Sequence, residues 1–551
     1  MIYPKIPLAQ SIIEIFRAKG IQHIIISPGS RNAPLTIGFV NNSNFNCYSI
    51  VDERCAAFFA LGIAQQIKKP VVVVCTSGSA LLNYYPAFAE AFYSEISLIV
   101  VSTDRPKSKI DIGDGQTIRQ ENVYANHSLY NANLDEHPSF ENDFLINEAI
   151  NTAFTKKGPV HINVPFEEPL YETVTELSVN PIINFNPINI NSIEELASFK
   201  NDWIASKKKL VLIGSLHPNS IEQKFIDILG NDNSVVVMTE ITSNVHHSNF
   251  ISNIDTIITP FSEQDFNEFQ PDILLTFGGM IVSKRIKTFL RKYQPKQHWH
   301  IDPSRAYDTY ACLSKNFEIE PNKFFENFFT KTFTTESNYQ ENFITIRELR
   351  KKKHFEFINK IYFSDLKVFA IILSKLMPNS QLQISNSSPI RYAQLFSINP
   401  TIEVFCNRGT SGIDGCTSTA IGAASVSNKT TVLITGDIGF FYDSNALWNN
   451  YIPKNFKILL INNGGGGIFR ILAGHEETPV FNTFFETSHC LTAKHLAKMY
   501  GLVYLTASDE SSIETNFEMM LSQNEKPVLF EIFTPTIEND KALLQYFKEL
   551  E

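Results

Sequence analysis

The sequence lacks the features of a disulfide-stabilised, nucleic-acid-binding or membrane-spanning protein. Its seven cysteines are scattered and form no CxxC pair, which is typical of reduced core residues in a cytoplasmic protein. The formal net charge of −10 argues against a general nucleic-acid-binding surface. No apolar run approaches the roughly 18 residues that cross a bilayer, and the segment MIYPKIPLAQ (1–10) has no apolar signal core. We expect a cytoplasmic protein without nucleic-acid or membrane partners.

The length and the pattern of apolar runs predict three α/β domains with parallel sheets. A chain of 551 residues suggests roughly three domains at about 150 residues each. Apolar runs alternate with amphipathic stretches, as in parallel α/β sheets. An Asn-, Pro- and Ile-rich stretch (179–192) predicts a linker, and the charged stretch RELRKKKHFEF (347–357) predicts a solvated joining helix. We expect domains over 1–178, 193–345 and 358–551.

The expected strands are the apolar runs of these domains, at 23–27, 48–51, 71–75, 97–102 and 161–165, at 209–214, 234–240, 272–279 and 298–302, and at 402–405, 430–437, 456–463 and 527–533. Within the first set, the segment 79–93 predicts one intervening helix.

Four consecutive glycines follow one of these strands, in INNGGGGIFR (461–470), and a Gly-Asp pair ends another, in TVLITGDIGF. Asp437 precedes Asn463 by 26 residues, and both come just after a strand, so both can face one crevice at the sheet's carboxyl edge. A carboxylate, an amide oxygen and a backbone carbonyl suit Mg²⁺, and glycines let backbone approach a diphosphate. Either motif alone is more often an ordinary strand-to-helix turn. A P-loop is absent, and GTSGIDG (409–415) is a poor dinucleotide fingerprint.

Together the two motifs resemble the thiamine-diphosphate signature, although Ile438 stands where the generic pattern has Gly. That cofactor needs a carboxylic acid in an apolar pocket at a strand end. Glu53, in SIVDERCAAFFALGIAQ (49–65), is the candidate, because desolvation would raise its pKa and favour proton sharing. The alternative is that Asp52 and Glu53 only favour a helix N-terminus. Ile413 is a candidate apolar support beneath the cofactor, or else a core residue in a tight turn.

Further motifs are more specific, namely SPGSRNAPL (27–35), DER (52–54), STDRP (102–106), GDGQTIRQ (113–120), GGMIVSKR (278–285), SNSSPIR (385–391), NRGTSGIDG (407–415) and NNGGGGIF (462–469). With them the chain resembles, nearly end to end, the 2-succinyl-5-enolpyruvyl-6-hydroxy-3-cyclohexene-1-carboxylate synthases of menaquinone biosynthesis. The resemblance implies a transferase with pyrimidine-binding, central and diphosphate-binding domains, in that order. It implies decarboxylation of 2-oxoglutarate and conjugate addition of the resulting enamine to isochorismate. It also implies a homodimer or homotetramer, because such enzymes build the site from the first domain of one subunit and the third of another.

The resemblance assigns roles residue by residue. The catalytic positions it implies are Glu53, Gln116 and Ser387. The implied substrate-binding positions are Ser30, Arg31, Arg105, Lys284, Arg285, Arg391, Arg408, Ile468, Phe469 and Leu472, the last three forming an apolar wall. The implied cofactor positions are Glu53, Ile413, Gly436, Asp437, Ile438, Asn463 and Gly465, of which Asp437, Asn463 and the carbonyl of Gly465 would bind Mg²⁺ or Mn²⁺.

Charge supports the substrate positions independently. Both substrates are dianions, and burying carboxylates requires paired cations, for which Arg offers bidentate geometry. Six of the implied positions are Lys or Arg. For any single one, a solvated surface charge is the simpler interpretation.

Two alternatives remain open. Another thiamine enzyme, such as an acetohydroxyacid synthase or a 2-oxoacid decarboxylase, would show a flavin spectrum or turn over pyruvate alone. A nucleotide-binding or regulatory protein that kept the fold without the chemistry would fail to bind thiamine diphosphate.

Overall fold

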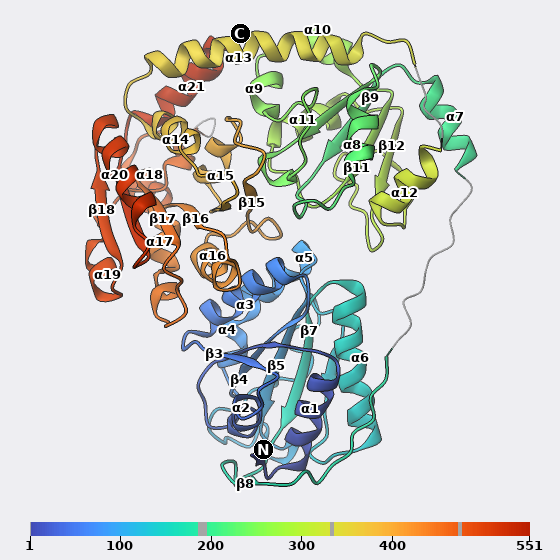
Figure 1. Ribbon diagram of the computed structural model, residues 1–551, viewed down its shortest axis with the longest axis vertical. Helices are drawn as coiled ribbons and strands as arrows, with labels where there is room; N and C mark the ends of the chain where they lie inside the picture. Colours follow the sequence, from blue (N-terminus) through green and yellow to red (C-terminus); the bar gives the residue numbers. More distant parts are fainter. Residues whose placement is uncertain (1, 186–195, 331–334, 472–475) are drawn as a thin grey trace.

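The computed structural model describes residues 2–185, 196–330, 335–471 and 476–551, which form three parallel sheets with helices on their faces (Figure 1). The expected class of three α/β domains is confirmed. Residues 179–185 contain no helix or strand. Residues 186–192 of the predicted linker lie outside the described residues. So does residue 193, where the central domain is expected to start.

The first sheet has the strand order β3-β2-β4-β5-β7-β6. Its strands are β2 (His23–Ile26), β3 (Asn46–Ser49), β4 (Val71–Cys75), β5 (Leu98–Asp104), β6 (Asn131–Asn133) and β7 (Val160–Pro165). Its helices are α1 (Pro7–Ala18), α2 (Ala33–Val40), α3 (Glu53–Ile67), α4 (Ala80–Asn83), α5 (Tyr85–Ser94) and α6 (Phe140–Lys156). A short antiparallel pair, β1 (Tyr3–Pro4) and β8 (Thr173–Val174), lies beside them.

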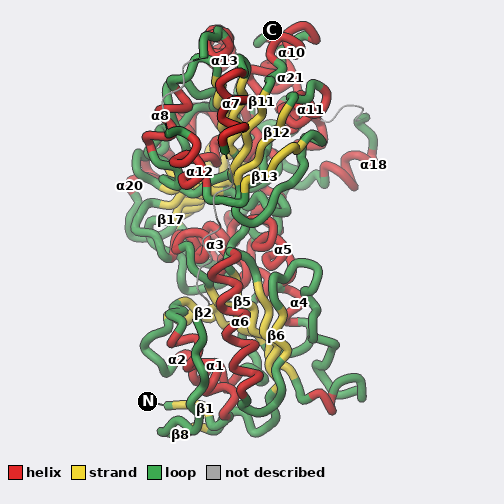
Figure 2. The backbone as a smooth tube through the Cα atoms, turned by 90° about the vertical axis from the view of Figure 1, so that its right-hand side faces the viewer, coloured by secondary structure: helices red, strands yellow, loops and turns green. Residues whose placement is uncertain are grey.

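Strand β4 shows why the run VVVVC is apolar throughout. Val72 and Val74 pack in the core beneath α1, α2 and α6, whereas Val71 and Val73 pack in the core that contains α3 and α5. A parallel strand covered on both faces needs an apolar side chain at every position. Figure 2 shows α1, α2 and α6 beside this sheet in the lower half of the molecule.

The central sheet has the order β10-β9-β11-β12-β13. Its strands are β9 (Lys209–Ile213), β10 (Val235–Thr239), β11 (Ile273–Phe277), β12 (Gln297–Ile301) and β13 (Leu313–Phe317). Its helices are α7 (Ala197–Ala205), α8 (Gln223–Gly230), α9 (Ile254–Ile258), α10 (Glu263–Phe269), α11 (Lys284–Lys292) and α12 (Pro321–Phe328). Helix α13 (Tyr339–Lys360) runs from this part of the chain to the third sheet (Figure 1), which confirms the helix predicted at 347–357.

The third sheet has the order β15-β14-β16-β17-β19-β18. Its strands are β14 (Gln381–Ile384), β15 (Glu403–Phe405), β16 (Thr431–Gly436), β17 (Phe456–Asn462), β18 (Val503–Ala507) and β19 (Val528–Phe533). Its helices are α14 (Asp365–Ser374), α15 (Ser388–Ala393), α16 (Cys416–Ser425), α17 (Asp437–Tyr442), α18 (Pro479–Phe481), α19 (Lys494–Met499), α20 (Glu510–Ser522) and α21 (Asn539–Glu549).

Two expected elements differ from the structure. The helix expected at 79–93 is two helices, α4 and α5, and a proline at the start of α5 suits a helix N-terminus because it has no N–H to leave unpaired. The strand expected at 48–51 is β3, which ends at Ser49. The chain leaves the sheet there because Asp52 caps α3, accepting a hydrogen bond from the Cys55 N–H at 3.1 Å.

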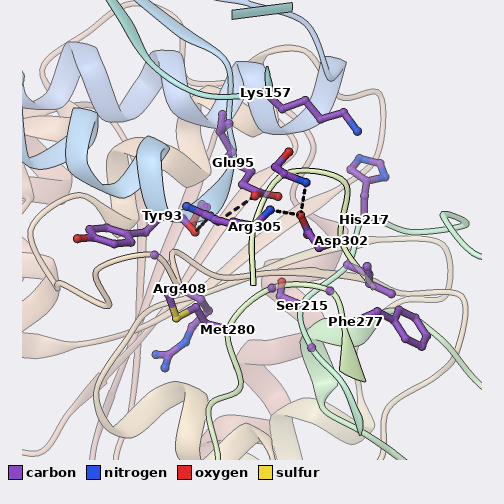
Figure 3. Close-up of a pocket in the computed structure, with 18 of the residues that line it drawn as sticks. Tyr93, Glu95, Lys157, Ser215, His217, Phe277, Met280, Asp302, Arg305 and Arg408 are labelled. Atoms are coloured by element: carbon purple, nitrogen blue, oxygen red, sulfur yellow. Dashed lines mark hydrogen bonds and ion pairs between the residues drawn. The ribbon is translucent and has the colours of Figure 1, made fainter. Parts of the chain in front are cut away.

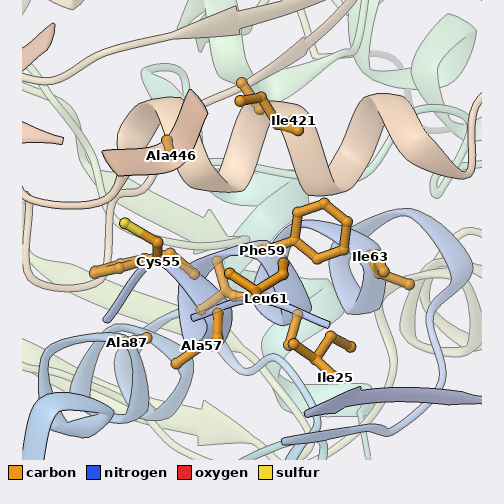
Figure 4. Packing of buried hydrophobic residues seen from close by; sticks show 14 of the residues in the cluster. Ile25, Cys55, Ala57, Phe59, Leu61, Ile63, Ala87, Ile421 and Ala446 are labelled. Atoms are coloured by element: carbon orange, nitrogen blue, oxygen red, sulfur yellow. The ribbon is translucent and has the colours of Figure 1, made fainter. Parts of the chain in front are cut away.

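The first and third domains share one hydrophobic core, centred on the crossing of α3 and α16 (Figure 4). A methyl group added to Gly62 would lie 2.0 Å from the Thr419 carbonyl oxygen, and one added to Gly422 would lie 2.0 Å from the Phe59 carbonyl oxygen. Glycine at both positions therefore lets the two backbones touch. The contact fixes the first domain against the third within one chain.

No helix in the described ranges is both long and apolar enough to cross a membrane.

Candidate active site

The loops carrying Asp437 and Asn463 meet at the carboxyl edge of the third sheet. Strands β16 and β17 are parallel neighbours, with Gly436 opposite Ile461. One carboxylate oxygen of Asp437 accepts the N–H groups of Gly464 at 2.9 Å and Gly465 at 3.0 Å. The glycine loop thus folds around Asp437.

Asp437 is a buried carboxylate, with 3% of its surface exposed. Burial raises its pKa to about 6, against the opposing effect of the backbone N–H groups that it accepts, which include that of Ile438 at 2.7 Å. Among the described residues, its one salt-bridge contact is His489, whose Nε2 lies 3.4 Å away and whose own pKa is lowered by burial. A cation bound here would stabilise the ionised carboxylate.

Asn463 presents an unpaired oxygen beside it. The side-chain nitrogen of Asn463 donates to Asp365 at 3.0 Å, and its buried Oδ1 has no hydrogen-bond partner among the described residues. The hydroxyl of Thr536 donates to the Asn463 backbone carbonyl at 2.6 Å. Buried polar atoms are rarely left unpaired in proteins, so this oxygen is a candidate ligand atom.

The glycine loop needs its glycines for space. Gly464 has a φ of +77°, and a methyl group on Gly465 would lie 2.9 Å from the Glu486 carbonyl oxygen. That same carbonyl accepts the Gly466 N–H at 2.6 Å. The Glu486 side chain is itself fixed by a buried ion pair with Arg470.

The donor set fits a hard divalent cation. It comprises the Asp437 carboxylate, the free Asn463 oxygen and the carbonyl of Gly465. Among the described groups, that carbonyl accepts one backbone hydrogen bond, from the Gly467 N–H at 3.0 Å. No group of three or more His, Cys, Asp and Glu side chains suited to a metal occurs in the part of the chain described. A single carboxylate suffices for Mg²⁺ when phosphate oxygens and water complete the octahedron.

The apolar positions lie around this loop. Ile468 and Phe469 are half-buried in the short helix Gly467–Ile471, with the Phe469 ring 6.1 Å from that of Phe485. Leu472 lies outside the described residues. Ile413 lies close to α17, because a methyl group on Gly439 would be 3.6 Å from the Ile413 Cβ.

Ser387 has a backbone conformation that side chains rarely adopt, with φ +72° and ψ −129°. It precedes α15, where the Pro389 ring would lie 3.8 Å from a methyl group on Gly436. Strained residues of this kind cluster at functional sites because the surrounding structure must hold them in place.

Two guanidinium groups of the third domain lie near each other. Arg408 donates to the Asn386 side-chain oxygen at 2.7 Å, and the buried Nε atoms of both Arg391 and Arg408 have no hydrogen-bond partner within the described ranges. Burial lowers the pKa of Arg391, and the charge of Arg408 lowers it further. The charge of Asp255 offsets this lowering in part, and an anionic ligand would pair with both guanidinium groups directly.

Lys284 and Arg285 begin α11 with exposed side chains. Cations at a helix N-terminus oppose its macrodipole, and a bound anion would relieve that repulsion. The preceding turn is held by Glu240, whose carboxylate accepts the N–H groups of Val282 and Ser283, each at 2.7 Å. Burial raises the pKa of Glu240 to about 7.

Glu53 begins α3 in the first domain. Burial raises its pKa, and the neighbouring charge of Asp52 adds to that effect. Its charge acts on the buried side chains of Cys75 and Tyr84, near the carboxyl edge of the first sheet. The next residue, Arg54, instead reaches the third domain of the same chain and donates to the Tyr442 carbonyl at 2.8 Å.

The other first-domain positions assigned to substrate binding or catalysis differ in burial and in their hydrogen bonds. Arg105 donates to the Ser77 hydroxyl at 2.8 Å and to the backbone carbonyl of Gln116 at 3.3 Å. Gln116 has a φ of +55° and an exposed side chain, and Ser30 is exposed. Arg31 is buried and donates to the Phe166 carbonyl and to Glu168. Its charge is thus partly neutralised within the first domain.

A cavity of about 490 Å³ lies at the carboxyl ends of β9, β11 and β12 and extends to Arg408. Figure 3 shows Arg305 reaching into it between Glu95 and Asp302, with Arg408 and Met280 below. The guanidinium of Arg305 pairs with Glu95 at 2.9 Å, which joins the central domain to the first.

Three buried carboxylates around these positions were missed by sequence reasoning. Asp365 holds Asn463, Glu240 holds the turn before Lys284, and Glu90 accepts the N–H groups of Gly409 and Thr410 beside Arg408. Only Glu240, which follows the apolar run SVVVMT, carried the signal of an acid at a strand end. The other two lie in helices with nothing in their local sequence to mark them.

Three domain families match the chain in order. Residues 6–127 match the thiamine pyrophosphate enzyme N-terminal TPP-binding domain, 190–384 the middle domain of thiamine pyrophosphate, and 387–532 the thiamine pyrophosphate enzyme C-terminal TPP-binding domain. The three-sheet architecture and the Asp437–Asn463 loops, with these matches, define a thiamine pyrophosphate enzyme.

Comparison with individual relatives identifies the family within this class of enzymes. The chain is 68% identical to a 2-succinyl-5-enolpyruvyl-6-hydroxy-3-cyclohexene-1-carboxylate synthase of Flavobacterium psychrophilum and 65% identical to that of Flavobacterium johnsoniae, covering 100% of both chains in each comparison. It is 51% identical to the synthase of Christiangramia forsetii over 99% of each chain. The protein belongs to the family of 2-succinyl-5-enolpyruvyl-6-hydroxy-3-cyclohexene-1-carboxylate synthases.

Proposed function

We propose that this protein decarboxylates 2-oxoglutarate and joins the product to isochorismate in menaquinone biosynthesis, forming 2-succinyl-5-enolpyruvyl-6-hydroxy-3-cyclohexene-1-carboxylate. The observation that carries the proposal is the full-length similarity to synthases that bear this name, at up to 68% identity among those given above. Residues 1–178 would bind the cofactor's pyrimidine and residues 358–551 its diphosphate, with 193–345 as the central domain.

The metal would be Mg²⁺ or Mn²⁺, bound by Asp437, the Asn463 side-chain oxygen and the Gly465 carbonyl. The orphaned Asn463 oxygen and the buried carboxylate of Asp437 support this role. Gly436 and Ile438 would line the diphosphate site on either side of Asp437, and Ile413 would support the cofactor rings. Thiamine diphosphate, when bound, supplies the electron sink for breaking and forming the carbon–carbon bonds.

Glu53 would share a proton with the pyrimidine ring nitrogen of the cofactor. Its raised pKa supports this role, because a carboxyl group that keeps its proton more readily can act as a hydrogen-bond donor. Gln116 and Ser387 would contact the reacting substrate, and the cofactor's amino group, one of these two side chains or water would transfer protons.

Six cations would bind the substrate carboxylates, namely Arg31, Arg105, Lys284, Arg285, Arg391 and Arg408. Ser30 would add a hydrogen bond, and Ile468, Phe469 and Leu472 would form the apolar wall. The two unpartnered guanidinium nitrogens of Arg391 and Arg408 support an anion site most directly.

The assembly would be a homodimer or homotetramer with Glu53 of one subunit facing the metal loop of another. The resemblance to thiamine enzymes that build the site from the first domain of one subunit and the third of another supports this arrangement. We also propose a cytoplasmic location, which the seven unpaired cysteines support.

The decisive experiment is a turnover assay with 2-oxoglutarate and isochorismate, with and without thiamine diphosphate and Mg²⁺. Product should form only when all four are present. Turnover of pyruvate alone would favour a different thiamine enzyme, and failure to bind thiamine diphosphate would favour a non-catalytic protein.

A further inference from the structure

Asp365 is a buried carboxylate that contacts the proposed metal site without belonging to it. It is the first residue of α14, and 2% of its surface is exposed. One carboxylate oxygen accepts the Thr534 hydroxyl at 2.6 Å, and the other accepts the side-chain nitrogen of Asn463 at 3.0 Å. Its own backbone N–H donates to the Asn539 side-chain oxygen at 2.8 Å.

This contact decides which way the Asn463 amide points. An ionised carboxylate can only accept hydrogen bonds, so Asn463 must turn its nitrogen toward Asp365. The Asn463 oxygen then faces the opposite way and is buried without a hydrogen-bond partner in the part of the chain that the structure describes. Without Asp365, the amide could rotate and present its nitrogen instead, which cannot bind a cation.

The buried carboxylates of Asp365 and Asp437 beside the free Asn463 oxygen are unfavourable unless a cation binds there. Asp365 and Asp437 are both buried, and their charges repel each other. A buried acceptor and two like charges are costly in a fold that gains nothing from them. A divalent cation would pair with the free oxygen and offset the repulsion.

We propose that Asp365 is a positioning residue that fixes the Asn463 amide with its oxygen directed at the metal. The inference rests on the proposed function, in which Asn463 is a metal ligand. Residues that orient metal ligands typically change affinity by about 10- to 100-fold when they are removed.

The test measures Mn²⁺ binding by electron paramagnetic resonance in the presence of thiamine diphosphate. Asp365→Ala should weaken Mn²⁺ binding by about tenfold or more. Asn539→Ala is the control, because it removes the acceptor of the Asp365 backbone N–H and keeps Thr534 and Asn463 as donors to the carboxylate. The control should lower the thermal midpoint while changing Mn²⁺ affinity less than about twofold, since a merely structural role would affect both variants alike.

A second test exchanges the side chains of Asp365 and Asn463. It stays informative even if Asp365→Ala does not fold. Asn463→Asp alone places two carboxylates against each other and should bind Mn²⁺ weakly. In the double variant Asp365→Asn with Asn463→Asp, the new amide can donate to the new carboxylate, whose other oxygen again faces the metal. Its Mn²⁺ affinity should therefore exceed that of Asn463→Asp alone by about tenfold.

The outcomes separate the two proposals. Wild-type Mn²⁺ affinity in Asp365→Ala, or no recovery in the double variant, would overturn the role of Asp365. If Asn463→Ala also binds Mn²⁺ normally, the metal site itself is misassigned and both proposals fail. Loss in Asn463→Ala with normal binding in Asp365→Ala would reject the positioning role alone.

Discussion

Glu90 of α5 accepts the backbone N–H of Gly409 at 2.7 Å, so a first-domain carboxylate holds the third-domain loop that carries Arg408. The same side chain accepts the Thr410 N–H at 2.6 Å and is 1% exposed. A methyl group on Gly409 would lie 2.6 Å from the Glu90 carbonyl oxygen, so glycine at this position lets the loop approach α5 this closely. The position of a proposed substrate cation is thus set by another domain.

Replacing Glu90 tests this dependence. In Glu90→Gln the new amide nitrogen must face a backbone N–H, and one charged hydrogen bond is lost, which costs about 2 kcal/mol. We expect the KM of a substrate to rise about tenfold or more, with thiamine diphosphate affinity little changed. Steady-state kinetics checks this. Ser94→Ala is the control, since it removes a different bond to the same carboxylate. Unchanged KM values would show that the loop does not need Glu90.

Glu53 can be tested by an isosteric change. Glu53→Gln should fold normally yet lose turnover by orders of magnitude, because an amide cannot share a proton in the same way. Turnover and thermal midpoint should be measured together. Asp52→Asn is the control, since it keeps the oxygen that caps α3. Near-normal activity of Glu53→Gln would reject the assignment.

Asp437 is tested through metal removal. Asp437→Ala should weaken thiamine diphosphate binding in the presence of Mg²⁺, measured by calorimetry, because a charged ligand to the metal is gone. After chelation of the metal, wild type and variant should bind the cofactor equally weakly. An affinity unchanged by the substitution in Mg²⁺ would remove Asp437 from the metal site.

Glu240 predicts a pH-dependent stability. Its folded pKa of about 7 exceeds the ordinary value of 4.5, so between these pH values the folded state keeps a proton that the unfolded state loses. The free energy of unfolding therefore falls as pH rises through this window, by on the order of 3 kcal/mol for this group. In Glu240→Gln this decrease is absent, so the stability of the variant relative to wild type should rise between pH 5 and pH 8. The measurement is the thermal midpoint of each protein at both pH values. A constant difference between the two midpoints would contradict the expectation.

Gly62 tests the crossing of α3 and α16. Gly62→Ala places a methyl group 2.0 Å from the Thr419 carbonyl oxygen, so the helices must separate, at a cost of about 1–3 kcal/mol. We expect a lower thermal midpoint. Gly115→Ala is the matched control, because a methyl group there meets nothing within 4 Å. Equal midpoints for both variants would mean that the crossing tolerates the added volume.

Most of the strands that sequence patterns predicted have continuous apolar runs, as β4 and β17 do, because both faces of these sheets are covered. Strand β14 (Gln381–Ile384) was missed, since two of its four residues are glutamines. Gln381 donates to Gln66 at 2.6 Å and Gln383 to Gln65 at 3.2 Å, both on α3. These partners satisfy buried amides from more than 300 positions away in the chain, a distance that no local pattern spans.

Contacts between residues far apart in the chain also limit how much of the candidate site can be predicted from the sequence. The motifs around Asp437 and Asn463 are local, and their strand-end positions follow from the sheet topology. Asp365 and Glu90 act on residues 98 and 319 positions away. Their roles arise only when helices from different parts of the chain pack against those loops.

The glycine contact between α3 and α16 also constrains how this chain can change over generations. A larger side chain at position 62 or 422 would meet backbone atoms of the facing helix, which no side-chain substitution on that helix can remove. A domain taken from a homologue that lacks either glycine would therefore fit this chain only if the two helices moved apart.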